Sequence, residues 1–369
     1  MGYTVALLAI FPVLFTSYLS FFIPALAQGP GGLPAAAGAV VHWLLSVLVI
    51  VTAMVVNLRG AWEVGRSAQV GAAVVLGAFV LLLVVWLVRD PAPSNAVGIV
   101  VRDLAGDHHG ALLLGLSIVL LNYGGWDGAA TYAGEVARPQ RNYPLAIGLA
   151  LLAVTLCYLL PVLAGVSVTI SPTIWNADPG AGWPVIARLI GGRWLAGLLA
   201  GAGLVSMWTL FNAQLLYVSR LPYVMACDGW LPALFARTSP RTAVPTAAIV
   251  MFCGFATAFA ALSFGSLSVI VCLLTIAGLV LEFLSLIVLR IRRPDAIRPF
   301  RVPGGWVGLG LVCLTPLAAA VLVLVATMRD WRSYPGQIFI VAMIVVSGVA
   351  LYPIRSRANR ARGKPASAP

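Results

Sequence analysis

A short polar stretch interrupts one of the long apolar segments of this sequence. It contains Tyr123, two adjacent glycines, Trp126 and Asp127, with apolar residues on both sides. Each glycine costs an α-helix about 1 kcal/mol relative to alanine. A carboxylate near the middle of a membrane costs a further ~2.5–3.5 kcal/mol on insertion scales. A helix that tolerates both costs is expected to line a cavity, where backbone unwound at Gly124 and Gly125 contacts a ligand.

The residue types in this stretch favour a ligand with a positive charge. The Asp127 carboxylate suits an ammonium group or a proton in transit, and the rings of Tyr123 and Trp126 suit an ammonium group or an aliphatic chain. We therefore predict a substrate-binding site at Tyr123, Gly124, Gly125, Trp126 and Asp127, with Asp127 also a coupling residue. The structural alternative is a plain helix kink, with Asp127 paired to a neighbouring helix.

Three other polar residues in or beside apolar segments are candidates for the same site. Asn212 offers its amide to a substrate or to an ordinary hydrogen bond between helices. Glu135 lies beside Arg138, and it is read either as part of an inner gate or as half of an interfacial ion pair. Glu282 lies about two helical turns before Arg290, where a gate or coupling role and a simple paired role are both open.

Enzyme and metal motifs are absent from the sequence. It contains no Walker A loop, GxSxG, HExxH or paired CxxC motif. The five cysteines form no CxxC pair and are expected to pack as small apolar residues. We therefore expect no enzyme activity, no metal site and no cofactor.

The elements that position these residues follow from the composition. Hydrophobic residues make up 61% of the chain and charged residues only 9%, with a mean hydropathy of +1.00. Soluble domains carry about 25% charged residues. In lipid, backbone polar groups must be satisfied internally, and long apolar runs without period-two alternation favour helices over a barrel. The predicted fold class is an all-α integral membrane protein.

We predict about ten spans of ~20 residues, the length that crosses a bilayer. They lie near 3–25, 36–57, 68–88, 111–135, 143–170, 193–219, 245–263, 267–290, 306–328 and 335–354. The boundary between the seventh and eighth spans is expected near Phe264. One transmembrane domain thus covers residues 1–354, and residues 355–369 are expected to form a basic, disordered cytoplasmic tail.

The basic residues predict the orientation. When the N-terminus is placed inside, most of the 23 Lys and Arg residues fall in inner loops and in the C-terminal tail. The formal net charge of +12 is therefore read as a topology signal rather than as a nucleic-acid surface. We expect a multi-pass protein of the cytoplasmic membrane with both termini in the cytoplasm, the bilayer as its environment and no nucleic-acid partner.

The polar stretch and the loop after it resemble a known family. The run Gly-Gly-Trp-Asp, then Ala-Gly-Glu-Val and Arg-Pro-Gln-Arg-Asn-Tyr-Pro, within residues 124–144, resembles the sixth helix and following loop of the amino acid–polyamine–organocation superfamily. The nearest branch comprises L-type amino acid and plant-type polyamine uptake proteins. Residues 57–66, 219–232 and 281–303 resemble, in the same order, that family's segments after helices four, eight and ten. The resemblance covers nearly the whole chain.

The resemblance implies a secondary transporter with a LeuT-like fold. In that fold the first ten of twelve helices form two inverted repeats, and the substrate lies between unwound parts of helices one and six. Aligned in this way, Met1 falls near the start of the family's third helix. The chain is therefore expected to be a truncated form of the fold, without the first two helices.

The expected function is proton-coupled symport or exchange of an amino acid or polyamine across the cytoplasmic membrane. The polyamine branch has an acidic residue in its sixth helix, which favours a cationic substrate over a neutral amino acid. The alternative is a non-transporting, truncated or split permease fragment that needs an upstream segment. Its partners would be the missing N-terminal helices or further copies of the chain. No filter-like repeat supports a channel.

Overall fold

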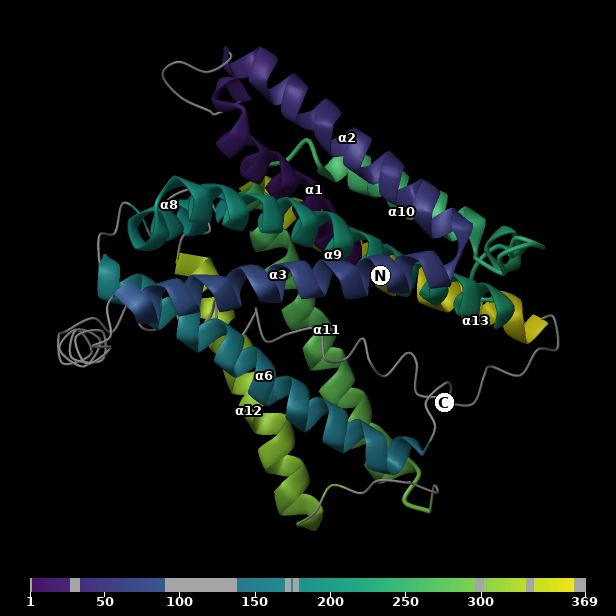
Figure 1. Cartoon of the computed structure of the whole chain (residues 1–369). Coiled ribbons are helices and arrows are strands. Elements are labelled where there is room, and N and C mark those ends of the chain that lie inside the picture. Colours follow the sequence, from purple (N-terminus) through teal and green to yellow (C-terminus); the bar gives the residue numbers. More distant parts are fainter. Residues whose placement is uncertain are drawn as a thin grey trace.

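The computed structural model describes residues 2–26, 34–89, 138–169, 174, 179–295, 302, 304–329 and 335–361. Within these ranges the regular structure is helical. The α-helices, shown in Figure 1, are α1 (Gly2–Phe22), α2 (Ala35–Arg59), α3 (Ala61–Arg89), α6 (Pro139–Val168), α8 (Pro179–Gly191), α9 (Arg193–Cys227), α10 (Thr246–Phe259), α11 (Phe264–Arg292), α12 (Gly305–Arg329) and α13 (Pro335–Ala361). Two short 3₁₀ helices lie at Pro24–Leu26 and Ala233–Ala236.

The helices confirm the predicted all-α membrane fold. Each predicted span coincides with a helix, except the span at 111–135, which lies outside the described residues. Six helices of the described chain are long and apolar enough to cross a membrane, namely α1, α2, α3, α6, α9 and α11. Shorter apolar helical stretches lie in α10, α12 and α13.

Two features differ from the expected pattern. Helix α13 continues to Ala361, so residues 355–361 are helical rather than part of a disordered tail. Hydropathy detects only the apolar part of a helix. The Arg, Ser and Ala residues after the apolar part of α13 are compatible with a helix, so the helix continues through them. The second feature is α8, which lies between the predicted spans 143–170 and 193–219. Because α8 has only 13 residues and is amphipathic, it falls below the length that a membrane span requires.

The ends of several helices have local explanations. Gly60 alone separates α2 from α3, and its φ of 125° is a conformation that residues with a Cβ rarely adopt. Ser263 precedes α11, and its Oγ accepts a hydrogen bond from the backbone N–H of Ser266 at 3.3 Å. This cap places the start of α11 at Phe264, where the boundary between two adjacent apolar spans is expected.

Helix α9 lies at the centre of the described structure and has the largest buried share of the six long apolar helices. Its second half packs with α1, α2 and α10, in a cluster that includes Leu8, Ile50, Phe211 and Phe252. Its first half packs with α3, α6 and α8, in a cluster that includes Leu82, Ile186 and Leu199. One helix therefore contributes to two cores, and residues along α9 are fixed from both sides.

The outward faces of the long helices are strongly apolar. Val88 is 77% exposed, Leu281 67% and Leu149 60%. Apolar surface of this extent is rare on soluble proteins because its contact with water is unfavourable, whereas in a membrane lipid chains cover it directly. The exposed surface thus agrees with a multi-pass membrane protein.

Candidate functional site

Most of the predicted site lies outside the part of the chain that the structure describes. These residues are Tyr123, Gly124, Gly125, Trp126, Asp127 and Glu135. Their proposed roles remain predictions. Asn212 and Glu282 are described, and so are the central helices around them.

Asn212 lies near the middle of α9 and is fully buried. Asn57 Nδ2, on α2, donates a hydrogen bond to Asn212 Oδ1 at 3.0 Å, and also one to the carbonyl oxygen of Ala53 at 3.0 Å. Asn212 Nδ2 donates to the carbonyl oxygen of Trp208 at 2.9 Å. This geometry fits the interpretation of Asn212 as a contact between helices, because both ends of its amide are engaged by protein groups.

Glu282 lies on α11 with an exposed side chain, directly before the buried Phe283. Its backbone carbonyl oxygen accepts a hydrogen bond from Ser285 Oγ at 2.7 Å. The other described acidic residues are Glu63, Asp228 and Asp295, and their side chains are exposed as well. None of the described carboxylates is therefore buried in the protein.

A small cavity lies where α1 and α9 cross. Tyr18 contributes from α1, Ser206 and Gly203 from α9, and Phe79 and Trp183 from α3 and α8. The rings of Phe79 and Trp183 meet edge to face, with their centroids 5.3 Å apart. The cavity measures about 50 Å³, close to the space of one or two water molecules. In this conformation it is too small for an amino acid or a polyamine.

The α1–α9 crossing is close because Gly203 has no side chain. A Cβ at this position would collide with the Tyr18 ring. A second close approach joins α3 to α9, where a Cβ on Gly71 would collide with the Thr209 side chain. Glycine at such positions lets helix backbones approach each other in a membrane. The two contacts hold α1 and α3 against the central helix.

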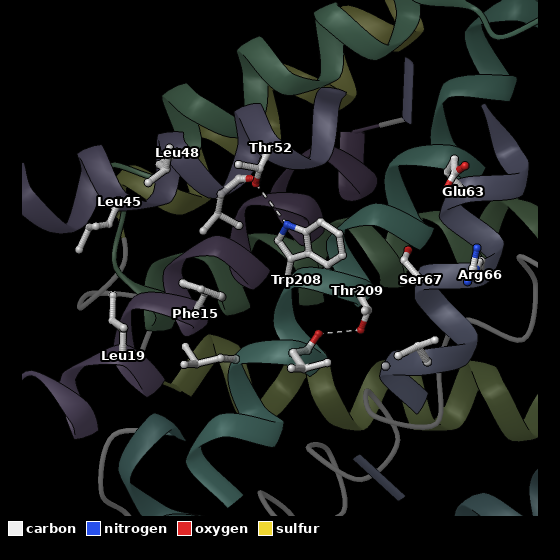
Figure 2. Close-up of a pocket in the computed structure, with 15 residues that line it drawn as sticks. Phe15, Leu19, Leu45, Leu48, Thr52, Glu63, Arg66, Ser67, Trp208 and Thr209 are labelled. Carbon is white, nitrogen blue, oxygen red and sulfur yellow. Dashed lines mark hydrogen bonds between the residues drawn. The ribbon is translucent and has the colours of Figure 1, made fainter. Parts of the chain in front are cut away.

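A much larger pocket lies on the other side of the crossing, between α2 and α3. It has a volume of about 930 Å³, and its floor is formed by α1 and α9. Figure 2 shows Trp208 projecting from α9 towards Thr52 on α2, with Glu63 and Arg66 at the end of the pocket farthest from Leu19 and Leu45. Trp208 Nε1 donates a hydrogen bond to Thr52 Oγ1 at 3.2 Å.

Sequence reasoning missed Tyr18, Thr52 and Trp208, which line these two cavities. Each lies in a predominantly apolar segment, and no motif distinguishes it from ordinary packing residues. The small residues around Gly203, in the run Ala200-Gly-Ala-Gly, are the one feature that could have indicated a close helix crossing there.

Comparison with known proteins matches residues 1–349 to a family described as amino acid permease. A probable polyamine transporter of Arabidopsis thaliana is 31% identical over 354 residues, which cover 94% of this chain and 67% of that protein. A polyamine transporter of Oryza sativa subsp. japonica is 34% identical over 319 residues, which cover 86% of this chain and 56% of that protein. A methylthioribose transporter of Bacillus subtilis is 28% identical over 296 residues, which cover 78% of this chain and 61% of that protein.

These relatives are longer than the present chain, which spans 56% to 67% of their length. Their names are those of transporters, in agreement with the expectation that this chain is not an enzyme. The match extends along almost the entire chain, from α1 to α13.

Proposed function

Because the chain belongs to the amino acid permease family, we propose that it transports a polyamine or an amino acid across the cytoplasmic membrane. The observation that carries this proposal is the match over residues 1–349, together with relatives named as polyamine transporters at 31% and 34% identity. The proposed orientation, with both termini in the cytoplasm, rests on the distribution of Arg residues.

A cationic substrate is favoured over a neutral one by the predicted site. An ammonium group inside a membrane needs a carboxylate partner, and the acidic side chains in the described part of the chain are all exposed. Asp127 is the acid that the sequence places within an interrupted apolar span. A branched-chain amino acid permease of Bacillus subtilis is 26% identical over 213 residues, so a neutral amino acid is the second candidate.

The proposed mechanism assigns binding to the interrupted span. Backbone groups freed at Gly124 and Gly125 would hold the substrate, Asp127 would bind an ammonium group or carry a coupling proton, and Trp126 would cover the aliphatic part. Proton-coupled symport and exchange are both compatible with these roles. Glu135 and Glu282 are proposed as gate or coupling residues.

Helices α1, α2 and α9 would act as a fixed part of the transporter. Alternating access needs one group of helices to stay rigid while another moves around the substrate site. The hydrogen bond from Asn57 to Asn212 and the close contact of Gly203 with Tyr18 hold α1, α2 and α9 together. We therefore assign Asn212 to this scaffold, and we place the α1–α9 cavity beside the substrate path because Tyr18 and Ser206 bring two hydroxyl groups to its wall.

The proposal is tested by uptake in cells that lack their own polyamine carriers. The chain is expressed, and uptake of radiolabelled putrescine, spermidine, arginine and leucine is measured with and without a protonophore. Saturable uptake of the polyamines, with little uptake of leucine, is expected. Uptake of leucine alone would move the assignment to neutral amino acids, and no uptake of any of the four by a well-expressed chain would contradict the proposal.

A further inference from the structure

The large pocket between α2 and α3, called the groove from here on, opens at the surface formed by the long apolar helices. Figure 1 shows α2 and α3 meeting at one end, where Gly60 joins them, and separating towards the other end. Helices α1 and α9 form the floor between them, and the space measures about 930 Å³. That volume is at the upper end of the ~300–1,000 Å³ typical of small-molecule sites.

The wall of the groove is mostly hydrocarbon. Its apolar lining comes from Phe15, Leu19, Leu45, Leu48, Val49, Val70, Leu204 and Val205. Its uncharged polar side chains are engaged with protein groups: Trp208 donates to Thr52, Thr52 Oγ1 donates to the Val49 carbonyl oxygen at 2.8 Å, and Ser67 Oγ donates to the Val64 carbonyl oxygen at 2.8 Å. The hydrogen atoms of these groups are already donated to protein acceptors, so they offer a polar substrate few further hydrogen bonds, whereas an acyl chain would fit against the wall.

The end of the groove near Gly60 carries two opposite charges. Glu63 and Arg66 both line the pocket from the start of α3. Three residues apart, they are neighbours on one helix face. Both side chains are exposed, and neither takes part in an ion pair within the described part of the chain. The groove therefore combines an apolar wall with one anionic and one cationic group at a single end.

This charged end coincides with the expected edge of the membrane. Trp62 precedes Glu63 and is 78% exposed, and tryptophan is enriched at the interface between lipid and water. Arg59 and Arg66 lie at the same end, which the proposed topology places on the cytoplasmic side. A ligand that fills the groove would thus have its polar group at the inner leaflet and its chains beside Leu45 and Leu48.

The side chains of the groove offer few positions for the close approach of a further helix. Helices in membranes approach each other most closely at small residues, as α1 and α9 do at Gly203. Apart from Gly71, Ser67 and two threonines, the uncharged lining of the groove consists of bulky Phe, Leu, Val and Trp side chains. Flexible acyl chains fill an irregular surface of this kind more readily than a rigid helix does.

From these observations we infer that the groove binds a phospholipid whose headgroup carries a phosphate and a primary ammonium, as in phosphatidylethanolamine. Arg66 holds the phosphate, Glu63 holds the ammonium, and the acyl chains lie along α1, α2 and α9. A purely anionic headgroup satisfies Arg66 but is repelled by Glu63, so phosphatidylglycerol binds less well. The inference goes beyond substrate transport and does not depend on it.

Native mass spectrometry of the purified protein tests this inference. The full chain is delipidated in detergent and titrated with phosphatidylethanolamine or phosphatidylglycerol of identical acyl composition. Preferential binding of phosphatidylethanolamine is expected. The Arg66→Gln variant should bind it about five-fold more weakly, the factor that corresponds to the free energy of one basic residue at a lipid surface. The Glu63→Gln variant should lose the preference and bind phosphatidylglycerol at least as well.

Two controls keep the test decisive. Arg59→Gln removes the same charge from the same end of the helices, but Arg59 does not line the groove, so lipid binding should be unchanged. Val70→Trp fills the groove and should lower binding of both lipids while the protein stays monodisperse. Equal binding by the parent chain, Arg66→Gln and Val70→Trp would overturn the inference. Efficient crosslinking between two copies through a cysteine placed at Leu48 would also overturn it, in favour of a protein occupant.

Discussion

Asn57 on α2 donates a hydrogen bond of 3.0 Å to Asn212 on α9, and both side chains are fully buried. The surrounding core is apolar, with Ile50, Phe211 and Leu215 among its members. A polar pair in such surroundings fixes the relative position of two helices, because each partner loses its bond if either helix rotates or slides.

We predict that this pair stabilises the α2–α9 contact by a modest amount. Asn57→Ala and Asn212→Ala should each lower the thermal stability of the purified protein, and the double variant should be less destabilised than the sum. A coupling free energy of about 0.6 kcal/mol, and at most about 1.7, is expected from interhelical hydrogen bonds in membranes. Ser219→Ala is the matched control, since Ser219 is buried on α9 but bonds to Leu216 of its own helix. Strict additivity of the two asparagine changes would contradict this role.

A second prediction concerns the α1–α9 crossing. Gly203→Ala should destabilise the protein, because the added methyl group collides with the Tyr18 ring. Gly197→Ala, on the same helix, has no atom within 4 Å of the added Cβ. It should be neutral or stabilising by up to about 1 kcal/mol through helix propensity. The melting temperatures of both variants are compared in one detergent. Equal melting temperatures would contradict the prediction, because they would show that α1 and α9 can move apart at little cost in stability.

The α3–α9 contact gives a third prediction with the same design. Gly71→Ala should lower stability, since its methyl group would meet Thr209, whereas Gly77→Ala on the same helix meets nothing within 4 Å. Thr209→Ala combined with Gly71→Ala should recover part of the loss, because it removes two of the three atoms nearest to the added Cβ. If the double variant is no more stable than Gly71→Ala, the loss of stability does not come from the clash with Thr209.

The proposed orientation is tested by cysteine labelling in intact cells. In a background without the five native cysteines, Asp295→Cys lies after α11 and should resist a membrane-impermeant maleimide until the cells are opened. Arg188→Cys lies on α8 with an exposed side chain and should react from outside. The reverse labelling pattern would invert the topology and the assignment of the Arg-rich loops to the cytoplasm.

Much of the fold could be predicted from the sequence, because hydropathy over ~20 residues reflects the thickness of a membrane. It located α2 and α12 to within a few residues of their ends. It missed α8, whose 13 residues are too few for a span, and it ended the last helix before residues 355–361. Hydropathy detects burial in lipid, and neither an amphipathic surface helix nor a polar helical extension gives that pattern.

The partners of single polar residues were harder to predict than the helices. Asn212 was read with two roles open, and only its position opposite Asn57, 155 residues away in sequence, favours one of them. Trp208 and Thr52 are 156 residues apart and meet only through the packing of α2 on α9. Such contacts depend on which face each helix turns towards its neighbour. A helix that is apolar on all sides gives no sequence signal for that orientation.

The central claim, transport through a site at Asp127, is tested most directly by uptake into proteoliposomes. Purified parent chain, Asp127→Asn and Asp228→Asn are reconstituted, and uptake of labelled spermidine is measured under an inward proton gradient. Asp228 is an exposed acid at the end of α9, so its neutralisation controls for the loss of charge alone. The account predicts saturable uptake by the parent and by Asp228→Asn, and a near-complete loss with Asp127→Asn at equal protein content. Unchanged uptake by Asp127→Asn would contradict it.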